Sequence, residues 1–163
     1  MRKYKTLPMD KSWRRNLLDS GMWWYQENTP HPTGRKEEGA IAKAFRLRDR
    51  LLSYGGNLAV LALYDPDIDA LLDHGVIRGG RNAILHRMQP NQCHANSAEL
   101  WTVYPELMRI ATGYALSKDG GWRQHSWIVR ADGQVIETTV KRIAYFGITL
   151  NDKECWEFAE RNC

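Results

Sequence analysis

Cys93, His125 and Glu137 are the residues whose types, order and spacing could support covalent catalysis. Cys93 opens an expected helix, His125 lies on an expected strand 32 residues later, and Glu137 follows on the next expected strand after a further 12 residues. A thiol becomes a strong nucleophile when a neighbouring base takes its proton and a third polar group orients that base. The sequence therefore predicts a Cys-His-Glu triad, in a cysteine-dependent hydrolase or acyl transferase that acts on an amide, peptide or isopeptide bond.

A position at the start of a helix would assist this chemistry. The unpaired amides there create a positive potential that lowers the pKa of a thiol, and they can hold a developing oxyanion. The side-chain amides of Gln92 and Gln89 could add a donor to the oxyanion, whereas Asn96, one turn into the helix, could instead hold the preceding loop. The sequence leaves this choice open.

The hairpin between the last two expected strands decides whether the histidine and the carboxylate can meet. A two-residue turn at 132–133 would place Glu137 on the face away from His125, because side chains alternate along a strand. A three-residue loop at 131–133 instead places Glu137 opposite Trp127 and diagonal to His125, with Cβ atoms about 7–8 Å apart. We predict the three-residue loop, and we expect Trp127 to shield the contact between the imidazole and the carboxylate from water.

Each of these residues also has a structural explanation when it is taken alone. A free cysteine is often a buried and inert core residue, a histidine can be a satisfied core residue, and Glu137 could pair with Arg142. Cys93, His94, His125 and Glu137 include metal-binding residue types, but no Cys-x-x-Cys, His-x-x-x-His or His-Glu-x-x-His spacing occurs. No metal and no cofactor are therefore expected.

The apolar periodicity and the turn residues predict an α+β fold, in which the helix bearing the cysteine packs on an antiparallel sheet. The expected elements are helices over 37–54, 67–73, 93–104 and a last one capped by Asn151 or Asp152, strands over 109–117, 122–130 and 134–139, and an apolar run at 58–64 that fits a helix or a strand. Residues 1–85 are expected to form a helical, aromatic extension packed on the catalytic core of residues 86–163, in one compact domain overall.

Composition and charge narrow the class of protein. Hydrophobic residues make up 43% of the chain and charged residues 26%, which predicts a packed core. The net charge of +4 is mild, so nucleic acid is not an expected partner. The chain has three cysteines and shows no signal-peptide pattern or long apolar run, so we expect a reduced, cytoplasmic protein without a membrane partner. The oligomeric state stays open.

The order of a helix with a cysteine, a strand with a histidine and a strand with an acid resembles the papain-like superfamily. The likeness is nearest to its compact bacterial members, the cell-wall amidase-peptidase and transglutaminase-like groups, and it covers about residues 85–150. It implies that Cys93 is the nucleophile, His125 the base and Glu137 the third polar member. It also implies acyl chemistry on amide bonds without a cofactor, and a peptide or other amide-containing substrate, which could be a protein.

The sequence departs from the patterns of that superfamily at two places. Papain-type enzymes usually carry an oxyanion-hole glutamine several residues before the cysteine, and Gln89 and Gln92 both lie closer than that. His94 follows Cys93 where papain and transglutaminase motifs have a tryptophan. These departures leave the substrate class open. The runs around Cys93 and His125 also look like bacterial and phage proteins.

A different class of function is a non-catalytic binding protein, such as an inhibitor or an immunity factor. It would use the aromatic N-terminal loops, where Trp23 and Trp24 precede a loop rich in proline and glycine at 28–34. A selective, fast reaction of Cys93 with iodoacetamide at pH 6 would favour the enzyme, because only an activated thiolate reacts there.

Overall fold

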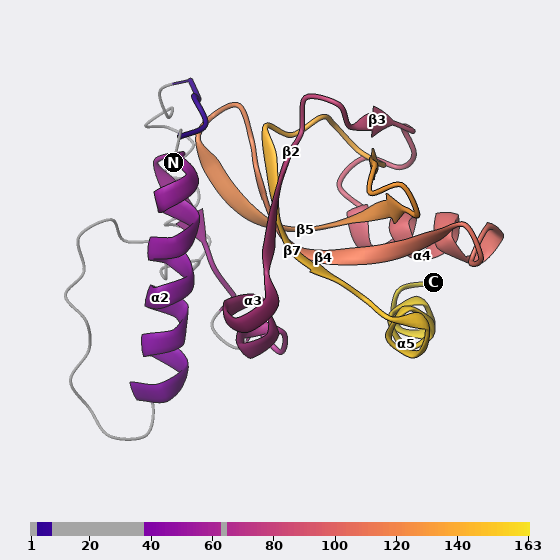
Figure 1. Cartoon of the computed structure of the whole chain (residues 1–163), viewed down its shortest axis with the longest axis horizontal. Helices are drawn as coiled ribbons and strands as arrows, with labels where there is room; N and C mark the ends of the chain where they lie inside the picture. Colours follow the sequence, from indigo (N-terminus) through magenta and orange to yellow (C-terminus); the bar gives the residue numbers. More distant parts are fainter. Residues whose placement is uncertain (1–2, 8–37, 63–64) are drawn as a thin grey trace.

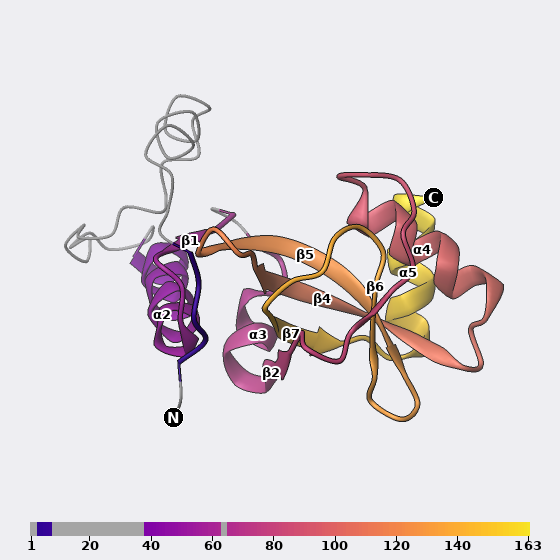
Figure 2. The same ribbon diagram turned by 90° about the horizontal axis from the view of Figure 1, so that it is seen from above.

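The computed structural model describes residues 3–7, 38–62 and 65–163. Trp23 and Trp24 lie outside the described residues. Figures 1 and 2 show a curved sheet with a long helix at one end and a pair of helices at the other. The helices are α2 (Glu38–Tyr54), α3 (Ile68–His74), α4 (Cys93–Val103) and α5 (Asp152–Asn162). The chain therefore has an α+β fold, as the sequence predicts.

The strands form one mixed sheet in the order β2-β7-β4-β5-β6-β3, and β1 also pairs with β5. The strands are β1 (Leu58–Val60), β2 (Val76–Gly79), β3 (Ile84–Leu85), β4 (Met108–Leu116), β5 (Gly121–Arg130), β6 (Val135–Glu137) and β7 (Ala144–Thr149). The three expected strands are confirmed as the antiparallel neighbours β4, β5 and β6. The pairs β1–β5 and β3–β6 are parallel, so the sheet is wider and more mixed than the sequence indicates.

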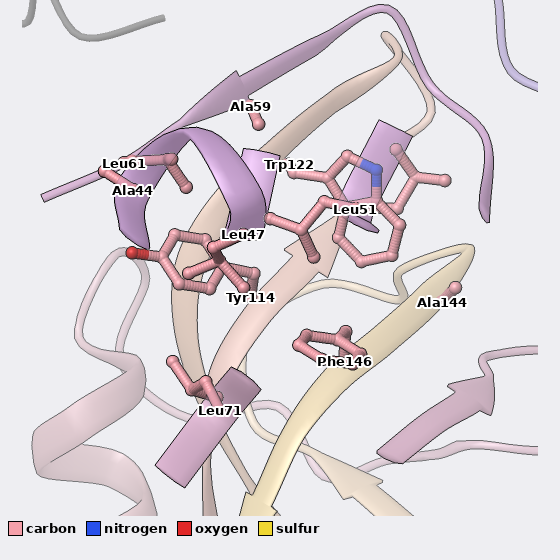
Figure 3. Packing of buried hydrophobic residues seen from close by; sticks show 11 residues of the cluster. Ala44, Leu47, Leu51, Ala59, Leu61, Leu71, Tyr114, Trp122, Ala144 and Phe146 are labelled. Carbon is pink, nitrogen blue, oxygen red and sulfur yellow. The ribbon is translucent and has the colours of Figure 1, made fainter. Parts of the chain in front are cut away.

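The helices at the two ends cover one face of the sheet. Leu47 and Leu51 lie one turn apart on α2 and pack on Trp122 and Phe146 of the central strands (Figure 3). At the other end, α4 and α5 enclose a second cluster, which includes Ala98, Trp101, Ile110, Ile128 and Phe158. The second cluster holds α4 at a fixed place on the sheet, through Ala98 and Trp101.

The opposite face of the sheet carries a third buried cluster, and this is the face that receives His125. Its members come mainly from alternate positions of the central strands: Ala83, Ala111, Ala115, Trp127, Val129, Val135 and Tyr145. Because strand residues alternate between faces, Trp127 and Ile128 enter different clusters. His125 shares the face of Trp127.

The β5–β6 hairpin has the predicted register. Arg130 N–H donates to the Gln134 carbonyl at 2.9 Å, and Gly133 N–H donates to the Arg130 carbonyl at 2.9 Å. Gly133 has a φ of 82°, in the left-handed region that a glycine adopts without strain. The three-residue loop at 131–133 is therefore confirmed, and Ile128 pairs with Ile136.

The outer edge of β5 has a gap at its centre. On that edge, β1 pairs with residues 121–123 and β6 pairs with residues 128 and 129. Among the described residues, no strand pairs with this edge at 124–127. Because His125 and Ser126 lie in the gap, a backbone donor of β5 is available to another element there.

Residues 58–85 contribute strands to this same sheet. β1, β2 and β3 all precede residue 86, and β3 lies beside β6, which carries Glu137. The segment that the sequence assigns to a covering extension therefore takes part in the sheet itself. No helix among the described residues has both the length and the apolar character needed to cross a membrane.

Candidate active site

The segment before α4 brings Cys93 to the gap in β5. It runs along β6, where His86 N–H donates to the Glu137 carbonyl at 2.8 Å and Met88 N–H donates to the Thr138 carbonyl at 2.8 Å. The carbonyl of Thr138 is thus paired with this segment instead of with β5. As a result, β6 separates from β5 after Glu137. The segment that runs along β6 then turns and begins α4 at Cys93.

Asn91 and Asn96 shape the turn into the helix. Asn91 has a φ of 61°, a left-handed conformation that asparagine tolerates better than most residues. Asn96 is buried, and its side-chain amide donates to the Gln89 carbonyl at 2.7 Å. Gln92 is the N-cap residue and makes no side-chain capping hydrogen bond. The first-turn amides next to Cys93 therefore keep their positive potential.

Of the amide side chains considered for oxyanion support, Asn96 holds the loop, which is the second of the two roles that the sequence left open. Gln89 and Gln92 are exposed to solvent in the turn before Cys93. Their side chains are therefore accessible to a ligand that reaches the start of α4.

His125 and Glu137 meet across the hairpin as the three-residue loop requires. His125 Nε2 and Glu137 Oε2 are 2.8 Å apart, and both side chains are buried. Glu137 does not pair with Arg142, whose guanidinium instead donates to Ser117 Oγ at 2.6 Å. The structure thus brings together the base and the orienting carboxylate that the sequence predicts.

The third group of the site is the half-buried thiol of Cys93. Cys93 and His125 interact, and each shifts the pKa of the other toward its charged form. Since Nε2 of His125 is used by Glu137, Nδ1 is the nitrogen left for the thiol. The backbone N–H of Ser126, in the gap of β5, is a further group that lowers the pKa of the Cys93 thiol.

These contacts shift the pKa values of the thiol and the imidazole in opposite directions. Burial alone would raise the pKa of Cys93, but the hydrogen bond and charge of His125 and the Ser126 N–H lower it below its ordinary value. Burial alone would lower the pKa of His125, but its bonds to Cys93 and Glu137 raise it. The site therefore favours a thiolate beside an imidazolium.

Glu137 is held as a fully paired carboxylate. Its Oε1 accepts from the Thr139 N–H at 2.7 Å and from Thr139 Oγ1 at 2.8 Å. Its Oε2 accepts from His125 and from the Tyr145 hydroxyl at 3.0 Å. Burial would raise the pKa of Glu137, but the hydrogen bond and charge of His125 and the two Thr139 donors lower it to about 2. The carboxylate therefore stays ionised at every pH at which the protein is expected to work.

Aromatic rings cover the contact between His125 and Glu137. Trp127 is fully buried, and its ring is nearly parallel to that of His125, with centroids 6.4 Å apart. Tyr145 packs on Trp127 with centroids 5.1 Å apart. Gly147 makes room for this arrangement, because a Cβ there would lie 2.6 Å from the Trp127 ring. The position of Trp127 fits the predicted shielding role. Tyr145 and Thr139, which donate to Glu137, are site residues that the sequence does not predict.

We expect Tyr145→Phe to weaken the site without removing a ring. The variant loses one of the donors to Glu137, and a hydrogen bond to a charged group contributes about 1.5–3 kcal/mol. The folded-state pKa of Glu137 should rise toward its ordinary value. The stability loss should therefore be full at neutral pH and shrink as the pH falls through the range in which Glu137 is protonated. Denaturant unfolding at several pH values measures the loss of stability, with Tyr104→Phe, at an exposed position, as the control. If the two variants had the same unfolding curves, Tyr145 would not support Glu137.

A second expected result concerns Trp127→Phe. The indole N–H has no hydrogen-bond partner within the described residues, so the variant loses packing area only. We expect a stability loss of about 1–2 kcal/mol and slower alkylation of Cys93, because water gains access to the His125–Glu137 contact. Trp156→Phe, at a half-exposed position on α5, is the matched control. Normal melting together with normal thiol reactivity in Trp127→Phe would show that the ring has no part in the site.

Metal ligation is not indicated by the geometry. Within residues 3–7, 38–62 and 65–163, no three side chains of histidine, cysteine, aspartate or glutamate converge as a metal-binding group.

Comparison with family models, with curated proteins and with solved structures gave no match. The geometry of the site is thus the basis for inferring what the chain does.

Proposed function

We propose that this chain is a cysteine-dependent hydrolase or acyl transferase that acts on an amide, peptide or isopeptide bond. The observation that carries the proposal is the buried pair of His125 and Glu137, with 2.8 Å between Nε2 and Oε2, whose imidazole interacts with the Cys93 thiol. A fully paired carboxylate, a raised imidazole pKa and a lowered thiol pKa are what an activated thiolate requires.

The reaction would proceed through an acyl-enzyme. The Cys93 thiolate attacks the carbonyl carbon, and the electron pair of the C=O bond moves to oxygen. When this tetrahedral intermediate collapses, the C–N bond breaks and the His125 imidazolium gives its proton to the leaving amine. Water or an amine then attacks the thioester, with neutral His125 taking the proton of the attacking group. The Cys93 thiolate leaves, and the imidazolium is restored beside it.

The oxyanion would lie at the start of α4. The backbone N–H of Cys93 is a first-turn amide of the helix, and such groups point toward a negative charge placed at the helix end. Gln89 and Gln92 are the exposed amides next to it and are candidates for a second donor. A papain-like layout is part of the proposal, because the cysteine opens a helix packed on the sheet and the histidine and acid lie on adjacent strands.

The proposed setting is a reducing one, such as the cytoplasm. The reaction needs Cys93 as a free thiol, and Cys93, Cys155 and Cys163 are all free. The proposed partner is a peptide or another amide-bearing molecule whose carbonyl reaches the exposed side of Cys93.

A screen of acyl amides with a fluorogenic amine leaving group, combined with intact-mass analysis after acid quenching, tests the proposal. We expect amine release and a transient acyl adduct that peptide mapping places on Cys93. Cys163→Ser is the matched control for an exposed thiol outside the site and should behave like the wild type. An adduct confined to Cys163, or amine release that persists in Cys93→Ala, would contradict the proposed function.

A further inference from the structure

His94 and Ser126 form a part-buried contact beside the triad, which the proposed mechanism does not use. His94 Nδ1 and Ser126 Oγ lie 2.6 Å apart, and Ser126 is fully buried. Ser126 Oγ also donates to Thr112 Oγ1 at 3.4 Å. The imidazole of His94 packs on the ring of Phe158 from α5, with centroids 5.9 Å apart. These contacts hold the His94 imidazole between Ser126 of β5 and Phe158 of α5.

Ser126 contacts both of the first two residues of α4. Its hydroxyl bonds to His94 on the face that α4 covers, and its backbone N–H, in the gap of β5, lowers the pKa of the Cys93 thiol. Successive helix residues point about 100° apart. One residue of β5 thus holds the first turn of α4 from two directions, at the edge of the strand and above its face.

Few other polar contacts hold this turn. Gln92 provides no side-chain cap, and the bond from Asn96 reaches back to the loop at Gln89 rather than to the sheet. The sulfur of Cys93 must stay in reach of both His125 and the Ser126 N–H to remain a thiolate. A small shift of the first turn of α4 would move the sulfur away from both groups. The His94–Ser126 bond joins this turn to β5 and therefore limits such a shift.

The charge state of His94 suits this task. Burial and the nearby charge of His125 lower the pKa of His94 below its ordinary value. His94 therefore stays neutral while His125 is an imidazolium. Because the Ser126 hydroxyl donates to Thr112 Oγ1, the Nδ1–H of neutral His94 donates to Ser126 Oγ. A second cation beside His125 is avoided.

We propose that His94 is a positioning residue, which fixes the first turn of α4 against Ser126 so that the Cys93 sulfur keeps its contacts with His125 and with the Ser126 N–H. This inference rests on the proposed role of Cys93 as an activated thiolate. It gives a function to the histidine that stands where the papain and transglutaminase motifs carry a tryptophan.

The test is the pH profile of Cys93 alkylation by iodoacetamide in a Cys163→Ser background. His94→Ala and Ser126→Ala should each move the profile to higher pH, so that alkylation at pH 6 is roughly three- to tenfold slower, which corresponds to a rise of about half to one pKa unit. The double variant should be no slower than the slower single variant, because both changes remove the same contact. His74→Ala, at an exposed position on α3, is the matched control and should match the parent.

A rescue separates positioning from a general loss of folding. His94→Asn places a side-chain amide near the position of Nδ1 and should restore the parent profile, whereas a merely destabilised variant would not recover. An unchanged profile in His94→Ala and Ser126→Ala, or additive effects in the double variant, would overturn the inference. Failure of the proposed function would look different, since the parent would show a low thiol pKa but form no acyl adduct with any amide.

Discussion

Cys93→Ala should abolish amide turnover and acyl-enzyme formation while the protein remains folded. Cys93 is half-buried at the first position of α4, where alanine is well tolerated and the helix keeps its buried anchors Ala98 and Trp101. Removal of the nucleophile leaves only the oxyanion donors and substrate binding, so the rate should fall by a factor on the order of 1,000 or more. Cys93→Ser should be nearly as inactive, because His125 cannot hold a serine hydroxyl ionised at neutral pH.

The measurement is steady-state turnover of the amide found in the screen, together with thermal melting. Cys155→Ala is the informative control for a cysteine: Cys155 is buried, accepts the Ile110 N–H at 3.4 Å and belongs to the core between α4 and α5. That variant should lose stability but keep its turnover per folded molecule. Substantial turnover in Cys93→Ala would show that the thiol is not the nucleophile.

Glu137→Gln should have a large effect although it leaves both Cys93 and His125 in place. The carboxylate accepts from the Thr139 N–H, from Thr139 Oγ1, from Tyr145 and from His125. A glutamine has one acceptor oxygen, and its NH₂ group can only donate. With the oxygen on the Thr139 N–H, the NH₂ faces His125 Nε2, which must then be unprotonated. The imidazolium is lost, and with it the main stabiliser of the Cys93 thiolate.

Two results are expected for this variant. The alkylation profile of Cys93 should move up toward that of an ordinary thiol, and turnover should fall by roughly 100-fold or more, though less than in Cys93→Ala. At neutral pH the protein should lose about 3 kcal/mol of stability, since the pKa of Glu137 is lowered from 4.5 to about 2 in the folded state. A lowered carboxyl pKa stabilises the fold above the unfolded value, so the difference from wild type should fade between pH 4.5 and about 2.

Glu99→Gln, an exposed glutamate on α4, is the control for the change of charge and should alter neither stability nor alkylation. If Glu137→Gln had the alkylation profile of the wild type, Glu137 would not act on the thiol through His125.

The part of the site that local chemistry determines could be predicted from the sequence. Gly133 at the end of a three-residue loop fixes the hairpin register, and this register alone brings Glu137 to the face of His125. The extent of α4, Cys93–Val103, agrees with the helix that the sequence predicts over 93–104. The last helix begins with a capping box in which Asn151 accepts from the Glu154 N–H at 3.0 Å, as the predicted cap requires.

Contacts between distant segments could not be predicted in this way. Tyr145 reaches Glu137 only because β7 pairs with β4, and β7 carries Gly147 at its centre, which weakens a strand pattern. β2 and β3 are short, and their positions depend on β7 and β6, so periodicity gives little signal there. His94 and Ser126 are 32 positions apart, and only the packing of α4 on the face of β5 brings them together.

The pH dependence of Cys93 alkylation in the wild-type protein tests the central claim most directly. The rate of carbamidomethylation at Cys93, Cys155 and Cys163 is followed separately by peptide mapping from pH 4 to 10. If Cys93 is an activated thiolate, it should react faster than the other two cysteines near pH 6. Its rate should also reach half of its maximum at a pH below about 8.5, the pKa of an ordinary thiol. A half-maximal rate at or above that value, or labelling confined to Cys163, would contradict the thiolate–imidazolium pair and the proposed function that depends on it.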